Sequence, residues 1–145
     1  MGLFSNLGAM VAPKLDSQRA IMTIAVAAVK ADGHVAAEEV LRIRGICALS
    51  PIFSANTSDQ DAAIINFADT VTSQLGHEAV VQAAQRLTPE LRETAFSFAC
   101  DMVLADGVVG STEESFLSNL LRDLAVSPEV GQAIIRATII RNRSL

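Results

Sequence analysis

Apolar residues recur every three or four positions along most of the chain, and polar residues fill the positions between them. The stretch after Pro13 has this spacing, at Ile21, Ile24, Ala25 and Ala28. Such a period is typical of an amphipathic helix, whereas a half-buried strand alternates apolar and polar residues. No segment of strand length shows a sustained alternation. The pattern predicts an all-α protein without a sheet.

Residues that begin and end helices divide this pattern into seven predicted helices. Thr88-Pro89-Glu90 and Ser127-Pro128-Glu129 each supply a hydroxyl N-cap, a proline at the first helical position and an acid near the positive end of the helix dipole. Gly33 and Gly76 interrupt the pattern where helices should end. The predicted helices cover about residues 17–31, 36–49, 58–75, 78–87, 89–105, 111–124 and 128–142.

Two further helix starts carry a possible capping box, in which a serine pairs with an acid three residues later. Ser58 is spaced to pair with Asp61, and Ser111 is spaced to pair with Glu114. We therefore expect each serine hydroxyl to accept a hydrogen bond from the first turn of its own helix.

One helical hairpin occurs twice in the sequence. A shift of 74 positions superposes Ala31-Asp32-Gly33 on Ala105-Asp106-Gly107, Val35 on Val109 and Glu39 on Glu113. The apolar positions of the following helices keep the same phase. We predict two hairpins, at about residues 17–49 and 89–124, related by an approximate two-fold axis and packed into one domain spanning residues 1–145.

The repeated bends can be explained without a ligand. Gly33 and Gly107 follow helix ends, where a left-handed backbone is common and glycine adopts it at the lowest cost. The aspartates can accept hydrogen bonds from backbone amides, and an acid in the next helical turn interacts favourably with the helix dipole. These roles account for one hairpin fully.

The number of acids at the two bends leaves a second interpretation open. Both bends together carry Asp32, Glu38, Glu39, Asp106, Glu113 and Glu114. If the bends meet in space, these carboxylates would repel one another unless a cation lay among them. Oxygen ligands suit Ca²⁺ or Mg²⁺, and the lack of paired His or Cys residues argues against structural zinc. The sequence thus leaves open a cation site or separate turn and capping roles.

The composition and charge of the chain argue against nucleic acid as a partner and against a membrane-spanning segment. The chain of 145 residues is half apolar, which suits a single folded core, and its net charge of -5 makes nucleic acid an improbable partner. The longest apolar run, residues 20–29, is too short to cross a membrane. Arg136, Arg141 and Arg143 are best explained as charges that complement the last helix dipole.

No residue set points to catalysis. Cys47 and Cys100 lie in apolar helical stretches and are expected to be buried, reduced thiols, as in a cytoplasmic protein. His34 and His77 have no neighbouring nucleophile and are expected at helix ends or on the surface. Lys30 is expected to pair with an acid rather than to act in a reaction.

The two bends are the residues by which the chain resembles the tellurite-resistance TerB-like family. They read Val29-Lys30-Ala31-Asp32-Gly33-His34-Val35 with Glu38-Glu39, and Val103-Leu104-Ala105-Asp106-Gly107-Val108-Val109 with Glu113-Glu114. The resemblance covers about Ser17 to Leu124. It implies a seven-helix fold with internal two-fold symmetry, a divalent-cation role for the acidic positions, and a link to tellurite resistance and membrane-associated stress-response complexes.

From these observations we expect a cytoplasmic interaction domain that binds a divalent cation and a protein partner, with a peripheral position at the inner membrane. A metal-free helical scaffold or homodimerisation module is the alternative. A Mg²⁺-dependent hydrolase is the least favoured function, because no residue in the pattern would position a substrate. A non-enzymatic role is therefore preferred.

Overall fold

The computed structural model describes residues 13–30, 37–105, 107 and 109–145. These residues form helices and connecting loops, with no strand among them. The helices are α2 (Pro13–Lys30), α3 (Ala37–Leu49), α4 (Ser58–Leu75), α5 (His77–Gln85), α6 (Pro89–Val103), α7 (Ser111–Leu124) and α8 (Pro128–Arg141). The prediction of an all-α fold is confirmed, and each described helix corresponds to a predicted one.

The start of α2 differs from its predicted position near Ser17. The helix begins at Pro13, four residues earlier. Proline is well tolerated in the first turn of a helix, because its missing N–H would have no partner there. The proline in this sequence therefore begins the helix and does not precede it.

Two capping predictions were wrong, although both helices start where expected. Thr57 rather than Ser58 caps α4, and its side chain and that of Gln60 form a reciprocal capping box. At α7 the N-cap is Gly110, so Ser111 is already inside the helix and makes no capping bond. In contrast, the hydroxyls of Thr88 and Ser127 cap α6 and α8 as predicted.

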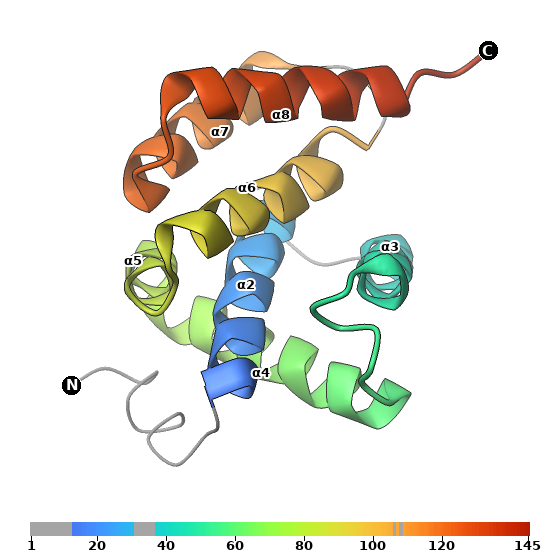
Figure 1. The fold of residues 1–145 in the computed structure, drawn as a ribbon, viewed down its shortest axis with the longest axis vertical. Helices are drawn as coiled ribbons and strands as arrows, with labels where there is room; N and C mark the ends of the chain where they lie inside the picture. Colours follow the sequence, from blue (N-terminus) through green and yellow to red (C-terminus); the bar gives the residue numbers. More distant parts are fainter. Residues whose placement is uncertain (1–12, 31–36, 106, 108) are drawn as a thin grey trace.

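Helix α2 runs through the middle of the bundle (Figure 1). It packs against α4 on one side and against α6 on the other, and α5 lies beside it. Helices α7 and α8 cover the side of α6 that faces away from α2. The fold is therefore a stack in which each of the two long central helices has neighbours on both sides.

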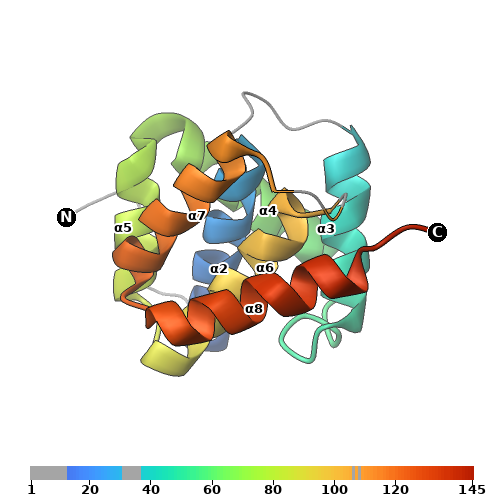
Figure 2. The ribbon, with the colours of Figure 1, turned by 90° about the horizontal axis from the view of Figure 1, so that it is seen from above.

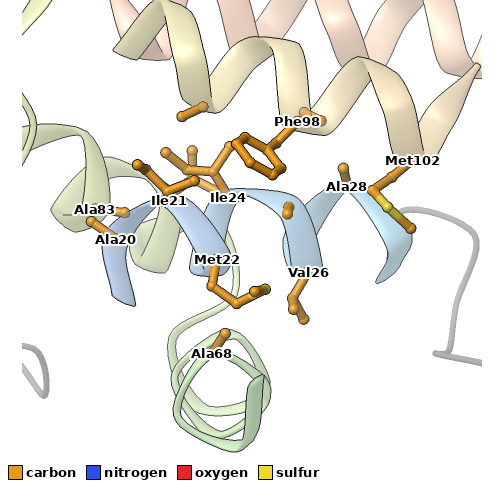
Figure 3. Close-up of a cluster of buried hydrophobic side chains, with 14 of the residues drawn as sticks. Ala20, Ile21, Met22, Ile24, Val26, Ala28, Ala68, Ala83, Phe98 and Met102 are labelled. Carbon is orange, nitrogen blue, oxygen red and sulfur yellow. The ribbon is translucent and has the colours of Figure 1, made fainter. Parts of the chain in front are cut away.

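The small side chains of α2 explain why it can be covered on opposite faces. Met22 and Val26 point toward α4, where Ala68 faces them, and Phe98 and Met102 of α6 lie on the other side of the helix (Figure 3). Most residues from Ala20 to Val29 are buried. Alanines among them let the neighbouring helices approach closely, and the resulting core is continuous across the bundle.

Helix α3 is placed differently, at the side of the stack (Figures 1 and 2). Only Ile43 and Cys47 of this helix are buried, whereas the side chains of Leu41 and Leu49 are 71% and 88% exposed. The loop that follows is held by Phe53, whose ring meets Phe98 of α6 edge to face at 5.8 Å. The helix is thus attached to the core along one narrow face.

The described helices can be compared with the predicted repeat. A shift of 74 positions places the first residue of α3, Ala37, on the first residue of α7, Ser111. The two-fold relation between the hairpins itself remains a prediction. None of the helices described here has the length and apolar character needed to cross a membrane.

Candidate functional site

The acids of the two bends lie at helix starts. Glu38 and Glu39 are in the first turn of α3, and Glu113 and Glu114 are in the first turn of α7. Glu38 and Glu114 are exposed, whereas Glu39 and Glu113 are partly buried. All four interact favourably with the positive end of a helix dipole. Their placement agrees with the capping interpretation.

Glu113 folds back over the start of its own helix. A Cβ atom added to Gly110 would lie 3.1 Å from both carboxylate oxygens of Glu113. Since Gly110 is the N-cap and Glu113 is the third residue of α7, this is the position from which an acid can approach the unpaired amides of the first turn. The geometry places Glu113 where it can stabilise the start of its own helix without a metal.

Two of the six predicted ligands, Asp32 and Asp106, lie outside the described residues. Within the part of the chain that is described, no group of three or more His, Cys, Asp or Glu side chains could hold a metal ion. Helix α3 lies on one side of α6 and α7 on the other (Figures 1 and 2). The described glutamates do not form a site by themselves, and the six-carboxylate site remains a prediction.

The second bend lies against the end of α8. Gly107 has a φ of 76°, the left-handed conformation expected from the sequence. A Cβ atom at this position would lie 2.9 Å from the backbone oxygen of Asn142. Glycine is therefore required here both by the backbone conformation and by the neighbouring chain. Gly33 of the first bend is outside the described residues.

Comparison with protein families identifies the chain. The family model described as tellurite resistance protein TerB matches residues 18–136. The chain belongs to the TerB family. This match extends from the first turns of α2 to the middle of α8 and confirms the resemblance inferred from the two bends. No curated protein and no solved structure matches the chain.

Lys30 joins two helices of this TerB-family domain. Its Nζ atom lies 2.7 Å from Oδ1 of Asp69 and donates to the hydroxyls of Thr72 at 2.9 Å and Ser73 at 2.8 Å. All three partners belong to α4. The prediction that Lys30 pairs with an acid is confirmed, and its oxygen partners indicate a structural link between α2 and α4.

His77 and the cysteines offer no nucleophile. His77 is the first residue of α5, its side chain is 69% exposed, and its Nε2 lies 2.9 Å from Oδ2 of Asp123. Cys47 and Cys100 are buried and free, and burial raises the pKa of each thiol to about 12. Protonated thiols are poor nucleophiles and poor metal ligands. The expected burial of the cysteines and the expected surface position of His77 are confirmed; His34 lies outside the described residues.

A groove that the sequence pattern does not predict lies between α3, α6 and α8. It has a volume of about 370 Å³. Its walls are formed by Arg42, Ile46, Leu49, Ser50, Phe98, Asp101, Arg141 and Asn142. In the sequence, Ile43, Ile46 and Cys47 fall on one face of this helix and Leu49 falls off that face, which was the available signal that α3 exposes apolar surface.

Arg141 and Asp101 form an ion pair across one wall of this groove. Burial raises the pKa of the Asp101 carboxyl above its ordinary value, and the guanidinium of Arg141 lowers it in part. Because Arg141 also lies in the last turn of α8, its charge complements the helix dipole as predicted. Arg136 and Arg143, the other basic residues of this region, are exposed.

Proposed function

We propose that this chain is a divalent-cation-binding interaction domain of the TerB family that acts in tellurite resistance or a related stress response. The observation that supports the proposal best is the matched position of two acids. Glu39 and Glu113 are each the third residue of a helix that follows an Ala-Asp-Gly sequence. Two bends that share this arrangement would supply carboxylates from two parts of the chain to one ion.

The donor set indicates which ion to expect. Aspartate and glutamate offer only oxygen atoms, which are the preferred ligands of Ca²⁺ and Mg²⁺. Zinc usually binds nitrogen or sulfur, and the two cysteine thiols of this chain are buried and protonated. We therefore expect Ca²⁺ or Mg²⁺ to bind with higher affinity than Zn²⁺.

The metal-free scaffold is the second candidate, and the position of Glu113 over Gly110 favours it. In that case the acids only stabilise helix starts. The same domain would still offer helix surfaces to a partner or to a second copy. A Mg²⁺-dependent hydrolase has the least support, because Lys30, the basic residue next to the first bend, is held by Asp69, Thr72 and Ser73 of α4.

The experiment is a thermal titration of chelator-treated, full-length protein with Ca²⁺, Mg²⁺ and Zn²⁺. An ion that binds only the folded state at 100 times its Kd adds about 2.7 kcal/mol to the free energy of unfolding. We expect a rise in Tm of several degrees with Ca²⁺ or Mg²⁺, and its loss when Asp32 and Asp106 are both replaced by Asn. An unchanged Tm with every ion would contradict the cation role.

Acids at other helix starts provide the matched control. Glu90 and Glu129 lie in the first turns of α6 and α8, and neither follows an Ala-Asp-Gly bend. Glu39→Gln and Glu113→Gln should reduce the ion-dependent rise in Tm, whereas Glu90→Gln and Glu129→Gln should leave it unchanged. If all four variants change the ion-dependent rise in Tm equally, the acids act only through helix dipoles. Each acid would then contribute about 0.3–1 kcal/mol to the free energy of unfolding.

Membership of the TerB family supports a proposal for the cellular setting. We infer that the domain works in the cytoplasm and contacts a membrane-associated stress-response complex. Fractionation of cells that express a tagged full-length chain should find it in the soluble fraction, with a share recovered at the inner membrane after exposure to tellurite. Recovery in the soluble fraction alone under both conditions would leave the membrane association without support.

A further inference from the structure

The groove between α3, α6 and α8 combines charge with apolar surface. Viewed as in Figure 2, α3 stands at the edge of the bundle and the C-terminal end of α8 runs toward it. The groove is open along one side and measures about 370 Å³. Small-molecule sites enclose most of their ligand, whereas an open groove covers one face of what it binds. This shape favours a segment of another protein as the occupant.

The charges in the groove favour a negatively charged occupant. Arg42 is exposed and makes no hydrogen bond or ion pair with another described residue. Arg141 is the second guanidinium, and Asp101 is the one carboxylate in the walls. The groove therefore carries a net positive charge on a protein whose total charge is -5. Such a local reversal of sign attracts a carboxylate.

The apolar part of the groove lies next to Arg42. Ile46 and Leu49 belong to the same helix as Arg42, and Phe98 approaches from α6. The exposure of Leu49, at 88%, leaves apolar area that a partner could remove from water. Ile46 and Phe98 also line a small apolar void between α3 and the core. An apolar side chain seated here would cover Leu49 and the exposed part of Ile46, and would reach the small part of Phe98 that is exposed.

We propose that this groove binds an acidic, apolar peptide segment of a partner protein, with its carboxylate at Arg42 and a large apolar side chain against Ile46, Leu49 and Phe98. The proposal rests on the interaction role proposed above and specifies its surface and partner. Arginine is suited to this task because its planar guanidinium can hold a carboxylate through two parallel hydrogen bonds.

An anionic membrane fits the groove less well. A lipid surface would bring many negative charges near the acidic remainder of the domain, including Asp101 inside the groove. A peptide can place a single carboxylate beside Arg42 and avoid that repulsion. A second copy of the chain is the other possible occupant, and it is treated as an outcome of the test.

The test begins with a library of random twelve-residue peptides displayed on phage and selected on the full-length protein in buffer containing EDTA. We expect the enriched peptides to carry Asp or Glu within two residues of Leu, Ile or Phe. Labelled copies of these peptides should bind in fluorescence anisotropy, and added salt should weaken them. Arg42→Glu and Leu49→Ser should each raise Kd at least about 10-fold.

Two residues of α3 serve as matched controls because they do not line the groove. Arg44→Glu changes the same charge as Arg42→Glu, and Leu41→Ser removes another exposed leucine. Both should bind the peptide within about twofold of the native protein. Unchanged thermal unfolding of Arg42→Glu and of the milder Arg42→Ala would show that the fold is intact.

Several results would overturn the proposal. The selection could enrich no peptide, or it could enrich peptides that lack Asp and Glu. Arg42→Glu and Arg44→Glu could also weaken peptide binding equally. Binding to phosphatidylglycerol vesicles that depends on Arg42 would instead assign the groove to membranes. A dimer in sedimentation that Leu49→Ser abolishes would assign it to a second copy. Because the peptide assay contains EDTA, its failure and the failure of the cation titration can be told apart.

Discussion

The two hairpins of the domain share a sequence pattern but differ in how they are covered. In the second hairpin, α7 buries Leu117, Leu120 and Leu124. In the first hairpin, α3 buries only Ile43 and Cys47. The difference arises from the neighbours, because α7 lies against α5 and α6 with α8 beside it, whereas α3 packs mainly against α6. The same apolar period therefore gives different burial.

This comparison indicates how stability is distributed in the domain. Helices with few buried side chains open at a lower free energy than the global unfolding of the protein. Helix α3 is such an element, since it leaves two leucines exposed and is attached through one face. We expect α3 to undock from a bundle that otherwise stays folded, and α7 to unfold only with the whole domain.

The largest expected effect separates Leu117 from Ile43. The two residues are equivalent under the 74-residue shift and both are 2% exposed. Leu117→Ala should lower the free energy of unfolding by about 2–5 kcal/mol, as usual for a buried leucine. Ile43→Ala should lower the free energy of unfolding by a smaller amount. If α3 can undock while the rest of the bundle stays folded, the loss cannot exceed the free energy with which α3 docks. Urea denaturation of both variants measures the difference.

Equal losses of stability in the two variants would break the comparison. That outcome would mean that α3 is as firmly docked as α7 and that its exposed leucines do not reflect weak attachment. Leu41→Ala serves as a control on the surface of α3, since Leu41 is 71% exposed. It should change the free energy of unfolding by no more than about 0.5 kcal/mol.

The fold was predictable to the extent that it depends on local sequence. Pro89 and Pro128 each follow a hydroxyl residue, and that combination located both helix starts correctly. Where two hydroxyl residues are adjacent, as at Thr57 and Ser58, the sequence could not decide which one caps the helix. The choice depended on Gln60, whose side chain can return a hydrogen bond to the N-cap backbone.

The candidate sites were less predictable because they depend on contacts between distant residues. The acids at the helix starts could be named from the sequence, but their distance from one another could not. Lys30 was expected to find an acid, yet its partner Asp69 is 39 residues away. The groove requires α3, α6 and α8 to meet, and no local spacing encodes that meeting.

The two cysteines test the opening of α3 directly. Cys47 lies in α3 and Cys100 in α6, both are buried, and burial raises the pKa of each thiol to about 12. Neither thiol should react in the closed protein, so the labelling rate reports local opening. We expect Cys47 to react at least about 10-fold faster than Cys100, equivalent to about 1.4 kcal/mol between their opening free energies.

The measurement uses the variants Cys100→Ser and Cys47→Ser, each with one thiol left, and a chromogenic disulfide reagent at pH 8. Dilute urea should hardly change the rate at Cys47 if the opening is local, because little surface is exposed. The rate at Cys100 should rise with urea as in global unfolding. Similar rates and similar urea dependence at both sites would show that the domain opens as one unit.

The smallest expected effect concerns two glycines inside helices. An added Cβ at Gly45 of α3 would meet no atom within 4 Å, whereas one at Gly131 of α8 would lie 2.5 Å from Cδ2 of Leu121 in α7. Alanine is favoured over glycine inside a helix by about 0.8–1.0 kcal/mol. Gly45→Ala should therefore stabilise α3, slow the labelling of Cys47 and leave the labelling rate of Cys100 unchanged.

Gly131→Ala should raise the free energy of unfolding by less than Gly45→Ala does, or should lower it, because Leu121 must move away. If both variants gain equally, α8 covers α7 more loosely than the contact with Leu121 indicates, and the two hairpins differ less than their burial implies.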